Sequence, residues 1–127
     1  MAGWWEYQRL SNGSRADRKA LESGDARDAL RARVVVNEVV DVGGSKAVEW
    51  LAVLNDAAPP GDDGVAVGCG PLEDLINEHA DSVIDEIERL ARRSPAFARA
   101  LSHVWPASSA MAKATELRLA VWIDRDK

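Results

Sequence analysis

The chain has 127 residues, of which 46% are apolar and 29% are charged, and its formal net charge is −5. This length fits one domain, which buries about two-thirds of the surface that its unfolded chain exposes and needs no disulfide or metal for stability. The single cysteine excludes an internal disulfide framework and a multi-cysteine zinc site, and the acidic balance argues against a general nucleic-acid-binding protein.

An aromatic cluster, Trp4, Trp5 and Tyr7, lies near the N-terminus in an otherwise polar segment. It forms either a helix that docks on the core or a contact anchor, because Trp and Tyr are enriched at interaction hot spots. The same segment has no basic region followed by an apolar stretch, so no secretory signal is expected. The longest uncharged stretch, 100–112, is shorter than the roughly 20 apolar residues of a membrane span. We therefore expect a cytoplasmic protein with no membrane contact.

Two helices are predicted before residue 59. The first covers 25–42, with Asp25 as its N-cap and Gly43 as its stop. Its β-branched run Val34–Val36 is also typical of a strand, but isolated strands would lack partners. The second helix has Ser45 as its N-cap and ends before the Pro-Pro-Gly turn.

Three amphipathic helices are predicted between residues 70 and 106. Gly70 caps the first, and Glu73 follows at a capping-box spacing. Asp81 caps the second, which covers 82–93, and Ser94 caps the third.

The C-terminal segment 117–123 alternates partly like a strand and is predicted to be helical, with Ser109 as the cap. Trp50 and Trp105 fall on apolar helix faces and are predicted to be core residues. In total these segments give about six short helices whose tight connections make consecutive helices antiparallel neighbours. The expected fold is all-α, a compact bundle that forms a single domain over 1–127, with a short helical-repeat-like stack as the alternative architecture.

From Gly70 to Leu75 the chain reads GPLEDL, followed by His79, by Pro95-x-Phe97 and by Leu101-x-x-Val104-Trp105. This pattern resembles a bacterial all-helical domain family of unknown function. The resemblance covers residues 34–105 and implies an all-α fold. It implies no activity, cofactor or partner, because the family brings none with it.

Acidic residues are concentrated in one stretch. Residues 47–88 contain 11 Asp or Glu and no Lys or Arg, whereas 1–46 carry a net charge of +1 and 89–127 a net charge of +5. The stretch is either a solvated face that basic residues of the flanks neutralise, or a docking surface for a basic partner. Such a surface raises the association rate and selects partners by charge.

His79 lies among carboxylates, so it is a candidate general base or metal ligand. The structural alternative is a half-buried histidine that hydrogen-bonds a backbone group. A zinc site needs three or four ligands, and the only other histidine is His103. Cys69, between two glycines, is interpreted as a small packing residue. We therefore expect no metal, no cofactor and no catalytic residue.

The sequence favours a non-enzymatic protein-interaction module. Its concrete form is an immunity- or antitoxin-like protein that binds a basic partner, such as a toxin domain, through an acidic face. An alternative is a small enzyme or ligand-binding domain that uses His79, His103 and nearby carboxylates, and a third interpretation is a homodimer formed through the aromatic N-terminus. The predicted partner-binding residues are Glu73, Asp74, Glu78, His79, Asp81 and Asp85.

Overall fold

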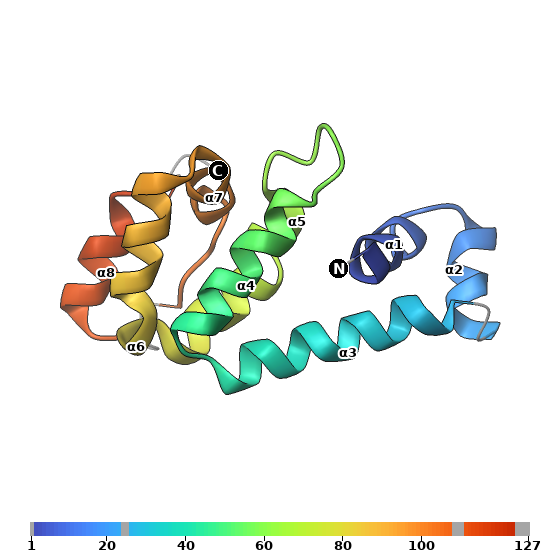
Figure 1. The fold of residues 1–127 in the computed structure, drawn as a ribbon, viewed down its shortest axis with the longest axis horizontal. Coiled ribbons are helices and arrows are strands. Elements are labelled where there is room, and N and C mark those ends of the chain that lie inside the picture. Colours follow the sequence, from blue (N-terminus) through green and yellow to red (C-terminus); the bar gives the residue numbers. More distant parts are fainter. Residues whose placement is uncertain (1, 24–25, 108–110, 124–127) are drawn as a thin grey trace. The chain divides into compact units, whose positions relative to one another are not determined.

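The structure is a computed structural model that describes residues 2–23, 26–107 and 111–123. These residues contain eight α-helices and no strand, so the predicted all-α class is confirmed, with more helices than the predicted six or so (Figure 1). The chain divides into two compact units, Met1–Glu38 and Val39–Lys127, here called the N-terminal and C-terminal units. The single domain over 1–127 stays a prediction.

The N-terminal unit contains α1 (Ala2–Ser11), α2 (Arg15–Ser23) and most of α3 (Arg27–Val42). The aromatic cluster lies on the helix α1, in which Trp4 is buried and meets Trp5 edge to face at a centroid distance of 4.8 Å. A reciprocal capping box begins α2: Asp17 N donates to Ser14 Oγ, and Ser14 N donates to Asp17 Oδ2, both at 3.2 Å.

The β-branched run of α3 is helical, as predicted. Ala29, Val36 and Val40 are buried at helical spacing, so burial of one face outweighs the strand preference of the valines. The predicted stop is confirmed, because Gly43 follows α3 with φ 70°, whereas the predicted cap Asp25 lies outside the described residues.

The predicted N-cap Ser45 is wrong. Gly44 is the N-cap, and Ser45 is the first residue of α4 (Ser45–Asp56). Gly43 and Gly44 both have positive φ values and turn the chain within two residues, so α4 begins directly after them.

The C-terminal unit continues with α5 (Val65–Gly68) and α6 (Pro71–Arg93). Two helices were predicted where α6 is one, so the predicted break and cap at Asp81 are wrong. The physical reason is that the apolar stripe runs through this point, with Ala80 and Val83 both buried. The carboxylate of Asp81 instead accepts the backbone N–H of Ala112 at 3.0 Å.

Gly70 is the N-cap of α6, as predicted, but the capping box is wrong. Gly70 makes no side-chain cap hydrogen bond, and the carboxylate of Glu73 accepts the backbone N–H of Trp105 at 2.7 Å instead. The cap of α7 (Pro95–Ser102) is confirmed, since Phe97 N donates to Ser94 Oγ at 3.1 Å.

Trp105 is 61% exposed, so its prediction as a core residue is wrong. The reason is that α7 ends at Ser102, which leaves Trp105 off the apolar face of that helix. Trp50 is half-buried. The last helix, α8 (Lys113–Ala120), confirms the helical prediction for 117–120, whereas 121–123 form a turn and a bend and the predicted cap Ser109 lies outside the described residues.

The C-terminal unit is built around α6, which packs against α4, α5, α7 and α8. This arrangement fits the predicted helical bundle. Its core is made of fully buried apolar side chains, the largest being Leu51, Leu54, Leu72, Leu75, Ile76, Ile87, Phe97, Leu101 and Leu119. One face of the central helix α6 carries polar side chains, and these side chains form the candidate site.

Candidate functional site

Polar side chains along one face of α6 form a row of hydrogen-bond acceptors. This α6 acceptor row consists of side chains three or four residues apart, which therefore share a helix face: Glu73, Asn77, Asp81, Asp85 and Glu88. Its first members accept backbone N–H groups of the segment after α7. Glu73 accepts from Trp105 at 2.7 Å, Asn77 accepts from Ala107 at 2.8 Å, and Asp81 accepts from Ala112 at 3.0 Å.

The end of the α6 acceptor row binds Arg118 of α8. Its guanidinium donates from Nη2 to Asp85 Oδ1 at 2.6 Å and from Nε to Glu88 Oε1 at 2.8 Å. These charge-assisted hydrogen bonds raise the pKa of Arg118 above its usual value. Hydrogen bonds from the Thr115 side chain and the Ala112 backbone lower the pKa of the Asp81 carboxyl. The row therefore attaches the C-terminal segment to α6.

Three of the predicted partner-binding residues, Glu73, Asp81 and Asp85, thus have partners within the chain. Asn77 and Arg118 complete this attachment and are not among the predicted site residues. The regular spacing of acceptors along α6 was a usable signal for Asn77. The sequence holds no comparable signal for Arg118, because its carboxylate partners lie 30 or more residues away.

The remaining predicted residues, Asp74, Glu78 and His79, lie near the end of α3. His79 Nε2 donates to the carbonyl oxygen of Asp41 at 3.0 Å, and Glu78 Oε2 is 3.7 Å from the same ring nitrogen. We call Asp41, Asp74 and Glu78 the α3–α6 acidic edge. Asp41 lies outside the acidic stretch 47–88, so charge counting along the sequence did not find it.

The α3–α6 acidic edge has no Lys or Arg partner among the described residues. Partial desolvation and the nearby charge of Asp41 raise the pKa of Asp74. Within the part of the chain that the structure describes, no Lys or Arg forms an ion pair with Asp41, Asp74 or Glu78. The last turn of α3 also contains no basic residue, although the helix dipole favours a cation there.

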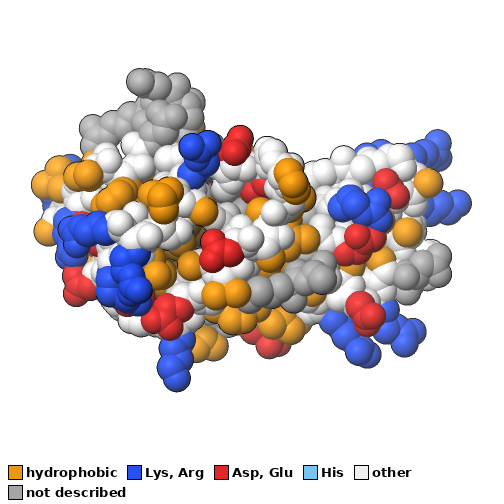
Figure 2. All heavy atoms as spheres, turned by 45° about the horizontal axis from the view of Figure 1, so that its top comes forward, with side chains coloured by type: hydrophobic (Ala, Val, Ile, Leu, Met, Phe, Trp, Pro, Cys, Tyr) orange, Lys and Arg blue, Asp and Glu red, His pale blue; other side chains and the backbone are white. Residues whose placement is uncertain are grey.

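Elsewhere five carboxylates of the acidic stretch pair with arginines of the C-terminal flank, namely Glu49, Asp63, Asp85, Glu86 and Glu88. Arg89 binds Glu49 and Glu86, and Arg99 lies 3.5 Å from Asp63. Figure 2 shows acidic and basic side chains interspersed on the face that it draws. For these carboxylates the arrangement agrees with the interpretation of a face neutralised by the flanks.

The two histidines bind separate backbone carbonyl groups. His79 binds that of Asp41, and His103 Nε2 donates to the carbonyl oxygen of Asp63 at 3.1 Å. The Cys69 thiol lies 3.7 Å from the carbonyl oxygen of His103. Across the described residues no group of three or more His, Cys, Asp or Glu side chains could hold a metal ion. The hydrogen bonds of both histidines are those of the structural alternative, namely side chains that fix the backbone.

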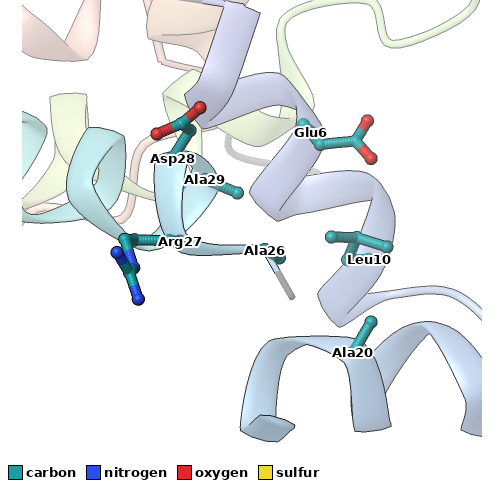
Figure 3. Close-up of a pocket in the computed structure, with 7 residues that line it drawn as sticks. All are labelled: Glu6, Leu10, Ala20, Ala26, Arg27, Asp28 and Ala29. Carbon is teal, nitrogen blue, oxygen red and sulfur yellow. The ribbon is translucent and has the colours of Figure 1, made fainter. Parts of the chain in front are cut away.

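A hollow of about 370 Å³ lies between α1, α2 and the start of α3 in the N-terminal unit (Figure 3). Glu6, which lines the hollow, forms an ion pair with Arg9 at 2.5 Å. The described lining combines apolar side chains of Leu10 and alanines with three charged residues. Its lining residues are Glu6, Leu10, Ala20, Ala26, Arg27, Asp28 and Ala29.

Among the described residues, no helix combines the length and apolar character required to cross a membrane. Comparison with curated proteins and with solved structures finds no match. A family model described as a family of unknown function, DUF6869, matches residues 36–124. This range contains every helix from α4 to α8, the α6 acceptor row and the α3–α6 acidic edge. The chain therefore belongs to the DUF6869 family, a family of unknown function.

Proposed function

We propose that this protein is a non-enzymatic protein-interaction module that binds a basic partner through the α3–α6 acidic edge. The observation that carries the proposal is that no Lys or Arg among the described residues forms an ion pair with this edge, where partial desolvation and the nearby charge of Asp41 raise the pKa of Asp74. Like charges held together destabilise the free protein. A cationic side chain of a partner would offset this repulsion on binding. The relief of repulsion would make the free energy of complex formation more favourable.

The proposed surface is narrower than the whole acidic stretch. Glu73, Asp81 and Asp85 hold the C-terminal segment, so the binding role falls to Asp41, Asp74 and Glu78. The side chain of Glu78 is 49% exposed, and Asp41 and Asp74 are also exposed. A partner can therefore reach these carboxylates with Arg or Lys side chains without unfolding the C-terminal unit.

The partner chemistry that fits is a surface rich in Arg and Lys. A guanidinium can bind one carboxylate with two parallel hydrogen bonds, and opposite charges accelerate the encounter. In its biological form the proposal is an immunity- or antitoxin-like protein that acts in the cytoplasm and blocks a basic toxin domain. The concentration of negative charge at one exposed edge supports this form.

The first test is a titration of the uniformly ¹⁵N-labelled full chain with a hexa-arginine peptide. We expect saturable amide shifts centred on residues 41, 74 and 78, and no comparable shifts with a hexa-glutamate peptide. The variant Asp74→Asn/Glu78→Gln is expected to weaken hexa-arginine binding at least tenfold. Asp28→Asn/Asp56→Asn is the matched control, because it also removes two exposed negative charges but leaves the α3–α6 acidic edge intact.

Two results would contradict the proposal. Equal weakening in both double variants would mean that the peptide responds to net charge alone, and unchanged binding in Asp74→Asn/Glu78→Gln would exclude the edge as the site. The immunity-like form is tested by co-expressing the tagged full chain with the product of the neighbouring gene. We expect a complex that the edge variant loses and the control variant keeps, and the absence of any complex would reject this form.

A further inference from the structure

The exposed face of α2 in the N-terminal unit is rich in positive charge, in contrast to the α3–α6 acidic edge. Arg15, Arg18, Lys19 and Glu22 occur at i, i+3, i+4 and i+7, so they share one face of the helix. They line a hollow of about 450 Å³, here called the α2 basic hollow.

Among the described residues, no carboxylate forms an ion pair with the three cations of the α2 basic hollow. Glu6 binds Arg9, and Asp17 accepts the backbone N–H of Ser14 in the capping box of α2. Among the described residues, Arg15 and Lys19 form no ion pair.

Only one N–H group of the Arg18 side chain forms a hydrogen bond with another described residue. Its Nη1 donates to the carbonyl oxygen of Gly13 at 3.0 Å, which leaves other guanidinium N–H groups for a ligand. Among the described residues, the hollow is lined by three cations and by one carboxylate, that of Glu22, in a chain whose net charge is −5.

We infer that the α2 basic hollow binds a phosphorylated small molecule that carries a hydroxyl or amino group besides its phosphate. Guanidinium groups bind phosphate oxygens with paired hydrogen bonds, and an ammonium adds a point charge. Arg15 and Lys19 lie about 6 Å apart along the helix axis, a span that lets both reach one phosphate group.

Glu22 selects among phosphorylated ligands. It lies about 4.5 Å farther along the axis than Lys19 and accepts hydrogen bonds, so it fits a hydroxyl or amino group of the ligand. The same carboxylate repels a ligand that presents negative charge throughout. The volume of the hollow lies in the range of small-molecule sites, roughly 300 to 1,000 Å³.

The test is a titration of the ¹⁵N-labelled full chain with ribose 5-phosphate, ribose and inorganic phosphate. We expect ribose 5-phosphate to shift the amides of residues 15–22 saturably, inorganic phosphate to bind several-fold more weakly, and ribose to cause no shift. Arg15→Gln/Lys19→Gln is expected to weaken ribose 5-phosphate binding at least tenfold. Arg31→Gln/Lys46→Gln, which removes two exposed cations elsewhere, is the matched control and is expected to bind like the wild type.

Glu22→Gln separates the two parts of the ligand. We expect this variant to bind inorganic phosphate at least as well as the wild type and to lose the preference for ribose 5-phosphate. Equal loss of binding in both double variants would overturn the inference. So would shifts that sulfate reproduces as strongly as ribose 5-phosphate, since that result means an adventitious ion only. Much tighter binding of a single-stranded oligonucleotide would also overturn it, in favour of a nucleic-acid surface.

Discussion

Asp81 accepts the backbone N–H of Ala112, at 3.0 Å from Oδ1 and 3.3 Å from Oδ2, so a carboxylate in the middle of α6 holds the N-cap residue of α8. Thr115, one turn into α8, hydrogen-bonds the same carboxylate. One acidic side chain thus supplies the acceptors at the start of a helix whose own cap residue, an alanine, offers none.

The first prediction concerns the acid dependence of stability at Asp81. Its hydrogen bonds lower the pKa of the Asp81 carboxyl in the folded protein below the value of about 3.9 that it has in the unfolded chain. The stabilisation is therefore present above the unfolded pKa and is lost as the pH falls through the folded pKa. In Asp81→Asn we expect a lower denaturation midpoint at pH 7 and a flatter fall in stability between pH 5 and pH 2. Urea denaturation of both proteins across this range measures the effect, and identical acid profiles would contradict it.

The second prediction concerns Asp74, whose pKa shift has the opposite sign. Partial desolvation and the charge of Asp41 raise its folded pKa, so its destabilisation appears as the pH rises from the unfolded pKa through the folded pKa. Asp74→Asn is therefore expected to raise the denaturation midpoint at pH 7 and to leave it unchanged near pH 2. Asp56→Asn, which removes a charge of the same sign at the end of α4, is the control and should change neither. If Asp74→Asn is less stable than the wild type at pH 7, repulsion between Asp74 and Asp41 does not destabilise the folded protein.

The helices could be predicted from the sequence, whereas the different roles of Asp81 and Asp74 could not. Helical spacing of apolar residues indicates α3 and α6, because burial of one face leaves a local and periodic trace. Nothing local distinguishes the two carboxylates. One faces Ala112 and the other faces Asp41, each more than 30 residues away, so their roles depend on how distant segments pack.

Helix ends were harder to predict than helices for a related reason. Asp81 has the side chain of an N-cap residue, but a cap forms only where the backbone leaves the helix, and the buried positions Ala80 and Val83 keep α6 continuous. Ser94 combines the right side chain with a following proline, and there the predicted cap is confirmed.

The third prediction compares two aromatic residues that the sequence pattern treats alike. Phe97 is 1% exposed and Trp105 is 61% exposed. Phe97→Ala leaves a cavity in the core and is expected to lower the free energy of unfolding by about 3 to 5 kcal/mol. Trp105→Ala removes a larger side chain but little buried area, so a loss below about 1 kcal/mol is expected. Chemical denaturation measures both losses, and similar losses would place Trp105 in the core after all.

The last prediction uses two adjacent glycines to isolate one contact. Gly43 has φ 70° and Gly44 has φ 83°, so alanine at either position costs about 1 to 2 kcal/mol of backbone strain. A Cβ at Gly43 would also lie 2.7 Å from Cδ2 of His79, whereas a Cβ at Gly44 would meet nothing within 4 Å. Gly43→Ala is therefore expected to destabilise the protein more than Gly44→Ala does.

The excess loss in Gly43→Ala should depend on the imidazole ring, because the ring both blocks the new methyl group and holds the end of α3 through Asp41. In a His79→Ala background the ring is gone, so the two glycine variants should lose equal stability. A double-mutant cycle of denaturation free energies gives this coupling directly. If the excess loss persists without the ring, the close approach of Gly43 to His79 is not what fixes glycine at this turn.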